Sequence, residues 1–484
     1  MKKSILGLIL LFSFQTLQAK AVEIIMWHSL AGHLGAEIRQ LVATFNSRQN
    51  EYIIKLVYKG EYTEAITSFA AAFRAKKAPA IMQIFEVGTT IMLYPQGIIK
   101  PVDDLMKEQG LALPEDSFLP ALRSFYSQNN RLVAMPFNTS IPVIYYNADI
   151  LAKVGYHQET FPRTWQEMEV LAEKLKQAGF LCTYTTAYPA WVQIESFSAI
   201  HGLPMIDPQR AVATYNNKAI VKHLERLKSW QKKHYFEYGG RTSDATVLFT
   251  SGRCALFSQS SGAYNSLSEL VKFKVGVASL PLDTSVTSVR HNNVAGGAAL
   301  WAVAGQSPEI YRGIALFFAY LAQAQTQQSW HQHTGYLPLG ITGDYALLGR
   351  ESRHPILRLA RSDLGQPQAA NTKHHAGPQN LIRAINDEAL EAIFAGMKTP
   401  RQAIDEAVTR ANYTLLRFAR NAKQISSVIS TNVARVKRSE TRVSVLQTST
   451  QACIFKKWAE KLNLKGTWDG RRDLVPRQGI KPDV

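Results

Sequence analysis

Residues 22–85 read VEIIMWHSLAGHLGAEIRQLVATFNSRQNEYIIKLVYKGEYTEAITSFAAAFRAKKAPAIMQIF, and this stretch decides the fold class. Its apolar runs at 22–27, 52–58 and 80–85 are typical of short buried strands. Between them, residues 34–45 and 62–76 repeat apolar side chains at the spacing of amphipathic helices. Strands that alternate with helices predict an α/β fold with a largely parallel sheet. Ligands of such sheets bind just beyond the carboxyl ends of the strands.

The same alternation continues toward residue 422. One long helix is expected to begin at the Ser307-Pro308-Glu309 cap and to run toward Gln332. The remaining predicted strands are 180–185, 254–257, 274–280 and 298–303. The remaining predicted helices are 164–178, one near Trp191, 219–234 and 379–422.

The two ends of the chain differ from its body. Lys2 and Lys3 precede an apolar run that is too short to span a bilayer, and an Ala-x-Ala site follows. Residues 1–21 are therefore predicted to be a secretory signal peptide, with a buried N-terminal helix as the alternative. Much of the formal net charge of +18 lies near the other end, so residues 423–484 are predicted to be a basic C-terminal extension of unknown role. The remaining positive charge is spread thinly, without the clustered Arg and aromatic residues of a nucleic-acid face.

Three cysteines, Cys182, Cys254 and Cys453, allow at most one disulfide within the chain. The sequence alone does not choose the pair, and the spacing matches no zinc pattern. We therefore expect packing residues and no metal centre.

A series of different short motifs is distributed along the chain between residues 22 and 422. Several of them directly follow predicted strands, where a ligand site is expected. They are Trp27-His28-Ser29, Tyr58-Lys59-Gly60-x-Tyr62, Glu86-Val87-Gly88-Thr89, Pro136-Phe137-Asn138-x-Ser140-x-Pro142-Val143-x-Tyr145-Tyr146-Asn147, Ser260-Ser261-Gly262, Gly296-Gly297-Ala298, Trp330-His331-Gln332-x-Thr334-Gly335-Tyr336-Leu337-Pro338 and Arg383.

In this order the motifs resemble those of the periplasmic solute-binding proteins of ABC importers, extracellular solute-binding protein family 1. The similarity is greatest to the members that bind sn-glycerol 3-phosphate. It implies a two-lobe periplasmic-binding-protein fold with hinge strands and the ligand in the interlobe cleft. Lobe one would comprise residues 22–139 and 291–340, and lobe two residues 141–290 and 341–422. It also implies a periplasmic monomer that delivers glycerol 3-phosphate or a glycerophosphodiester such as glycerophosphocholine to ABC permease subunits, without a cofactor and without nucleic acid.

The resemblance also implies the ligand-binding residues. Trp191, in a segment that is similar to the family's, is expected to be a pocket wall. The family's ligand contacts fall on Tyr62, Glu86, Ser140, Ser260, Gly297, Tyr336 and Arg383.

These residue types suit a glycerol phosphate, which has an anionic group at one end and hydroxyls at the other. Arg383 offers a planar fork for two phosphate oxygens, and the backbone N–H of Gly297 is unobstructed by a side chain. Glu86 is assigned to the glycerol end because a carboxylate accepts from hydroxyls and repels a phosphate. Further hydroxyl donors are Ser140, Ser260, Tyr62 and Tyr336.

Each of these residues also has a purely structural interpretation. Arg383 lies in an apolar stretch and could be an ion-paired helix arginine. Glu86 could be an acid at a helix N-terminus, stabilised by the helix dipole. Tyr62 and Tyr336 could be half-buried core side chains, and Gly297 could serve only a tight turn.

Catalysis has little support in the sequence, and we expect a binding protein, not an enzyme. Nucleophile elbows, His-Glu-x-x-His helices and phosphate-cradling loops with Lys are all lacking. His331 and His333, at i and i+2 of a predicted helix, face different sides and are poorly placed to share a metal. The helix is expected to end at Thr334-Gly335 and to present Tyr336 to the cleft. The alternatives are a sugar or oligosaccharide receptor of the same fold and, as a different class, a secreted glycerophosphodiesterase.

Overall fold

The computed structural model describes residues 20–94, 97–114, 117–207, 210, 212–340, 355–356, 359, 363 and 377–420. Residues 1–19 of the predicted signal peptide and the predicted C-terminal extension lie outside the described residues. The chain divides into two compact units, Met1–Ala419 and Arg420–Val484. None of the helices in the described part is long and apolar enough to cross a membrane.

The first sheet has five strands in the order β2-β1-β3-β14-β6. The strands β1 (Val22–His28), β2 (Tyr52–Tyr58) and β3 (Ile81–Phe85) are parallel, as predicted. The fourth strand, β14 (Gly296–Ala302), comes from a distant part of the chain and is antiparallel to both of its neighbours, β3 and β6 (Met135–Ser140). The sheet is thus mixed, with a single reversed strand.

The second sheet repeats this plan in the order β11-β8-β12-β7-β13. Its strands β8 (Cys182–Thr186), β11 (Phe236–Tyr238) and β12 (Cys254–Ser260) are parallel. The reversed strand is β7 (Pro142–Asn147), which lies between β12 and β13 (Val275–Ala278). Two short antiparallel pairs, β4 (Ser127–Gln128) with β5 (Arg131–Leu132) and β9 (Ile206–Asp207) with β10 (Val212–Ala213), stand apart from both sheets.

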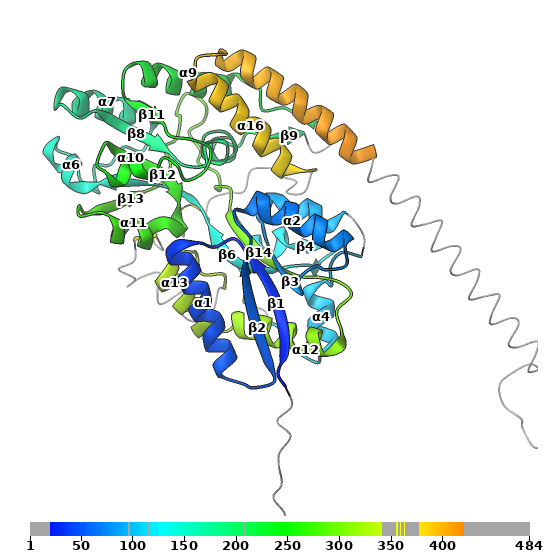
Figure 1. The fold of residues 1–484 in the computed structure, drawn as a ribbon. Helices are drawn as coiled ribbons and strands as arrows, with labels where there is room; N and C mark the ends of the chain where they lie inside the picture. Colours follow the sequence, from blue (N-terminus) through cyan, green and yellow to red (C-terminus); the bar gives the residue numbers. More distant parts are fainter. Residues whose placement is uncertain are drawn as a thin grey trace, which may run out of the picture. The chain divides into compact units, whose positions relative to one another are not determined.

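Each sheet is covered by its own helices, and we call the two assemblies lobe one and lobe two (Figure 1). Each has its own apolar core. Lobe one contains α1 (Gly32–Ser47), α2 (Tyr62–Arg74), η1 (Glu86–Gly88), α3 (Thr89–Leu93), α4 (Val102–Glu108), α5 (Pro120–Phe125), α12 (Pro308–Leu321) and α13 (Ala324–Thr334). Lobe two contains α6 (Ala148–Lys153), α7 (Trp165–Gln177), η2 (Ala190–Ser196), α8 (Phe197–Ile200), α9 (Lys218–Lys232), α10 (Thr246–Thr250), η3 (Ser261–Ala263), α11 (Tyr264–Leu270), α16 (Gln379–Phe394) and a helix at 400–420.

The chain crosses between the lobes where a reversed strand begins. The first crossing is at Ile141, between β6 and β7, and the second is the segment 279–295, between β13 and β14. Both crossings feed a strand that is antiparallel to its new neighbours. This is the hinge-strand connection that a two-lobe fold requires. The residue boundaries of the lobes remain a prediction, because the described chain between 341 and 376 is limited to four residues.

The single long helix expected from Ser307 toward Gln332 is wrong. It is divided into α12 and α13 at Ala322, and Gln323 has an extended backbone with φ −64° and ψ 133°. The side chain of Gln327 accounts for the break, because its amide donates to the carbonyl oxygen of Ser117 at 3.2 Å and to that of Ala322 at 3.5 Å. A tertiary contact therefore replaces a turn of helix.

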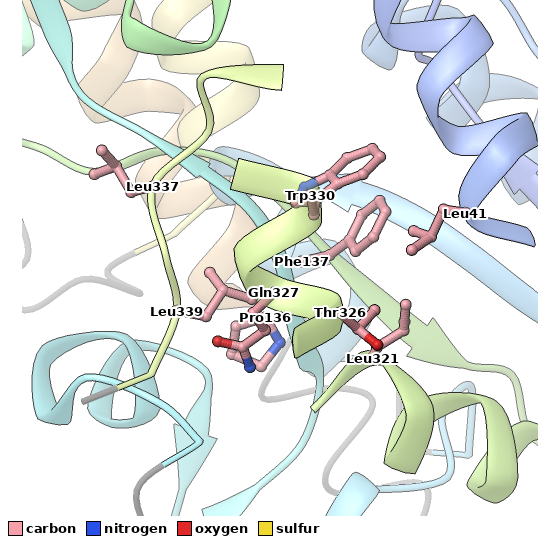
Figure 2. Close-up of a pocket in the computed structure, with 9 residues that line it drawn as sticks. All are labelled: Leu41, Pro136, Phe137, Leu321, Thr326, Gln327, Trp330, Leu337 and Leu339. Atoms are coloured by element: carbon pink, nitrogen blue, oxygen red, sulfur yellow. The ribbon is translucent and has the colours of Figure 1, made fainter. Parts of the chain in front are cut away.

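The second of these helices, α13, packs on lobe one through aromatic side chains. Trp330 stacks on Phe137 of β6 with a centroid separation of 4.9 Å. Figure 2 shows this pair beside Leu41 of α1, with Thr326 and Gln327 on the preceding turn of α13. The helix that leads to Tyr336 is thus held against the first sheet.

A disulfide joins Cys182 and Cys254, which face each other on the neighbouring strands β8 and β12. This settles the pairing that the sequence left open, while Cys453 lies outside the described residues. The two sulfurs and Glu237 form the one grouping with metal-ligand proximity in the described part of the chain. Since both sulfurs are in the disulfide, this grouping is not a metal centre.

Candidate functional site

Arg383 lies at the centre of the candidate site and contacts both lobes. Its Nε and Nη2 atoms, on α16, donate to Oε1 and Oε2 of Glu195 at 2.8 and 2.5 Å. Glu195 is on the π-helix η2 of the same lobe. Glu86, the first residue of η1 in lobe one, forms an ion pair with Arg383 Nη2 at 2.7 Å. One guanidinium therefore holds two carboxylates from opposite sides of the lobe boundary.

These three side chains are well buried, with exposed fractions of 16% for Arg383, 15% for Glu195 and 7% for Glu86. Burial opposes the charge on Arg383, but the two carboxylates outweigh it and raise its pKa above the ordinary value. Burial raises the pKa of Glu86, and the charge of Arg383 offsets only part of that increase. Burial also raises the pKa of Asp387, one turn further along α16, to about 7. The site thus holds more carboxyl groups than cations.

A chain of hydrogen bonds crosses the carboxyl ends of the first sheet and fixes Tyr62. The backbone N–H of Ser29 donates to Gln83 Oε1 at 2.8 Å, and Gln83 Nε2 donates to Asn138 Oδ1 at 2.8 Å. Asn138 Nδ2 then donates to the hydroxyl of Tyr62 at 3.0 Å. The ring of Tyr62 stacks on Phe85 at 5.2 Å. Because both ends of each amide are engaged, the hydroxyl of Tyr62 has a defined position.

Tyr336 enters the same cluster from the end of α13. The helix ends at Thr334, as predicted, and Gly335 takes the left-handed conformation with φ +79°. The Tyr336 side chain hydrogen-bonds with Asn138 and Tyr62, and burial raises its pKa to about 12. A Cβ on Gly262 of lobe two would lie 2.7 Å from the Tyr336 ring, so this ring rests directly on the backbone of the other lobe.

The two histidines before this turn have structural roles. His331 is buried, and its Nδ1 hydrogen-bonds with the carbonyl oxygen of Tyr336. His333 is exposed and hydrogen-bonds through Nδ1 with the carbonyl oxygen of Ser329 at 2.7 Å. They face different environments, as their spacing predicted.

Trp191 forms a wall between the lobes. It lies on η2 and is 5% exposed. A Cβ on Gly296, the first residue of β14, would lie 2.4 Å from Trp191 Cζ2, so only glycine allows this approach. Tyr188, which packs edge-on against Trp191 at 6.4 Å, has a left-handed backbone with φ +45°. The indole N–H of Trp191 is buried and has no hydrogen-bond partner among the described residues.

The three remaining predicted residues lie at the hinge. Ser140 is 2% exposed and pairs with Gly296 across β6 and β14. Gly297 has φ +98°, and a Cβ there would lie 1.8 Å from the carbonyl oxygen of Asn138. Gly297 thus lies within β14 and not in the tight turn of its structural interpretation, and the close approach to Asn138 is what requires a glycine. The Ser260 hydroxyl accepts from the backbone N–H of Gly262 at 3.2 Å and caps η3.

The structure thus brings the predicted residues into one region, with two changes to their expected arrangement. Glu86 and Arg383 were assigned to opposite ends of the ligand, but here they are in direct contact. The structural interpretation of Arg383 as an ion-paired arginine is also correct.

Sequence reasoning missed Glu195 and Asn138. Glu195 could have been found because it is an acidic residue in the otherwise buried run Ala190–Ser196. The motif at 136–147 was the signal for Asn138.

Three comparisons place the chain among known proteins. Residues 40–343 match the family model of bacterial extracellular solute-binding proteins. The sn-glycerol-3-phosphate-binding periplasmic protein UgpB of Salmonella typhimurium is 39% identical over 437 residues, which is 87% of this chain and 99% of the relative. The Escherichia coli protein of that name is 40% identical over 420 residues, or 84% and 95%.

Solved structures with low sequence identity share the fold. UgpB from Mycobacterium tuberculosis in complex with glycerophosphocholine has a TM-score of 0.69 at 21% identity, covering 82% of this chain and 99% of that one. The GacH receptor of Streptomyces glaucescens, solved unliganded and with acarbose, has a TM-score of 0.70 at 17% identity, covering 82% and 99%. The motifs, the two hinged lobes and these comparisons agree, and the chain belongs to the family of bacterial extracellular solute-binding proteins.

Proposed function

We propose that this protein is the periplasmic receptor of an ABC importer, and that it captures sn-glycerol 3-phosphate or a glycerophosphodiester and delivers it unchanged to the membrane permease. The curated relatives of nearly full length carry the name of a glycerol-3-phosphate receptor. We infer a monomer that works without a cofactor. We assign no catalytic role to any residue of the site.

The donors and acceptors of the site suit such a ligand. Arg383 keeps one guanidinium nitrogen, Nη1, without a hydrogen bond to any described residue. This nitrogen, the hydroxyls of Tyr62 and Tyr336 and the indole N–H of Trp191 are donors for phosphoryl oxygens or ligand hydroxyls. The carboxylates of Glu86 and Glu195 are acceptors for glycerol hydroxyls. A neutral sugar would use the acceptors and the aromatic walls but would gain little from Arg383.

The observation that carries the proposal is the meeting of both lobes at Arg383. Lobe two supplies Arg383 and Trp191, and lobe one supplies Glu86 and Tyr62. A ligand bound here contacts both lobes, so its binding free energy favours the closed arrangement of lobes. A permease can recognise the closed arrangement of the lobes.

Calorimetric titration of the mature protein with sn-glycerol 3-phosphate, glycerophosphocholine and maltose tests the proposal. We expect saturable binding of at least one of the first two and none of maltose. Mass spectrometry of the ligand after incubation should show it intact. Binding of maltose alone would replace the proposal by a sugar receptor, and metal-dependent hydrolysis of glycerophosphocholine would replace it by a phosphodiesterase.

A further inference from the structure

The charge balance around Arg383 bears on which glycerol phosphate the site takes. The guanidinium faces Glu195 of η2 and Glu86 of η1, and Asp387 of α16 interacts with it electrostatically. Arg241, the other cation that acts on Asp387, has its own ion pair with Glu391. One arginine is therefore the counterion for three carboxyl groups.

The geometry of Arg383 matters as much as the charge. A guanidinium binds an oxyanion most strongly through two parallel N–H groups, as in its bidentate contact with carboxylate or phosphate. The edge formed by Nε and Nη2 is already occupied by the two oxygens of Glu195 at 2.8 and 2.5 Å. A phosphoryl group then meets the remaining Nη1 side, close to Glu195 and Glu86. Each additional negative charge on the phosphoryl group is repelled by these carboxylates.

The two classes of glycerol phosphate differ in this charge. A phosphomonoester such as sn-glycerol 3-phosphate has a second pKa of about 6 and is largely a dianion at neutral pH. A phosphodiester has no second acidic proton and remains a monoanion. The site has one guanidinium for either of them.

We propose that the cleft selects phosphodiesters over phosphomonoesters, so that a glycerophosphodiester is the preferred ligand and the dianion of sn-glycerol 3-phosphate is the weaker one. This inference rests on the proposed function. It assigns Glu195 as the specificity-determining residue, because its carboxylate occupies the arginine edge that a dianion would need.

The test compares two ligands across pH. Glycerophosphoglycerol is the diester probe because its second alcohol is uncharged, and sn-glycerol 3-phosphate is the monoester probe. Affinities are measured by calorimetry between pH 5 and pH 8, and the ratio of the two is taken at each pH. Asp387, whose pKa burial raises to about 7, titrates in the same range and repels a dianion more than a monoanion. The ratio is therefore also measured in the Asp387→Asn variant, where its change with pH reports the second ionisation of the monoester.

At pH 8 we expect the diester to bind about tenfold or more tightly than the monoester, and the ratio to fall toward pH 5 as the monoester becomes a monoanion. The substitution Glu195→Gln should lower the ratio at pH 8, because it frees part of the arginine edge and removes one negative charge. Glu388→Gln, on the same helix as Arg383 but in an exposed ion pair with Arg410, should leave the ratio unchanged.

The wild-type protein alone can refute the inference, even if the Glu195 variant does not fold. A monoester that binds as tightly as the diester at pH 8, or a ratio that does not change with pH, would overturn the selection while leaving the proposed function intact. If neither ligand binds at any pH, the proposed function fails and this inference fails with it.

Discussion

Replacing Arg383 by methionine should cost the protein both stability and ligand affinity. Methionine retains much of the side-chain length but none of the charge. The substitution leaves the carboxylates of Glu195 and Glu86 without their counterion in a region where these side chains are 15% and 7% exposed. Removing one partner of a buried ion pair costs about 3–5 kcal/mol, because the other charge remains buried.

The size of the loss should depend on pH. Burial already raises the pKa of Glu86, and loss of the arginine raises it further, so protonation at pH 5 relieves its unpaired charge and pH 8 does not. We therefore expect a larger loss in the free energy of unfolding at pH 8. A second substitution, Glu195→Gln, in the Arg383→Met background should recover part of the stability.

Urea unfolding followed by tryptophan fluorescence, together with calorimetric titration, measures both effects. The matched control is Arg410→Met, which breaks an ion pair of similar length, 2.7 Å, whose side chains are 52% and 44% exposed. Such an exposed pair is worth about 1 kcal/mol or less. If Arg383→Met costs no more than this control, or if it binds ligand as the wild type does, the central role given to Arg383 is wrong.

Three further predictions follow from the geometry. Reducing the Cys182–Cys254 disulfide, which spans 72 residues, should lower the free energy of unfolding by about 4 kcal/mol, and equal urea midpoints with and without reductant would contradict this. Burial raises the pKa of Asp387 from 3.8 to about 7, so this group destabilises the folded state increasingly as pH rises from about 4 to 7; Asp387→Asn should raise the melting temperature at pH 8 and have no such advantage at pH 4. Gly262→Ala, whose new Cβ would lie 2.7 Å from the ring of Tyr336, should displace this ring and weaken ligand binding while lowering the melting temperature only slightly. Unchanged affinity would show that the ring is not part of the site.

The parts of the fold that local sequence determines were predictable. Residues 52–58 form β2 with the predicted ends, because a run of apolar and β-branched residues bounded by polar ones favours a buried strand. The end of α13 at Thr334 was also predictable, since Gly335 supplies the left-handed conformation that terminates a helix. In both cases the cause lies within a few residues of the effect.

The errors arose where a distant contact decides the local structure. The break at Gln323 has no proline or glycine that would predict it. The hydrogen bond that accounts for it is donated by Gln327 to the carbonyl oxygen of Ser117, which is 210 residues away in the sequence. The chain reaches β14 only after it has passed through every strand of the second sheet, in lobe two. Its return to lobe one sets the antiparallel direction of β14.

The same limit applies to the site. Arg383 and Glu195 are separated by 188 residues, so neither sequence position indicates the other as its partner. The resemblance predicted that Arg383 is a ligand contact, and only the structure shows that carboxylates occupy one edge of its guanidinium.

The two carboxylates of this cluster differ in what they depend on. Glu195 and Arg383 belong to lobe two, so their pair does not require the lobes to be closed. Glu86 belongs to lobe one, and its pair with Arg383 exists only while the two lobes are in contact. Glu195 therefore orients the guanidinium independently of lobe one, which reduces the entropy that a ligand loses in ordering it. Glu86 instead attracts the guanidinium from lobe one, and a ligand between the lobes competes with this ion pair. A ligand that accepts a hydrogen bond from Arg383 and donates one from a hydroxyl to Glu86 satisfies both groups at once.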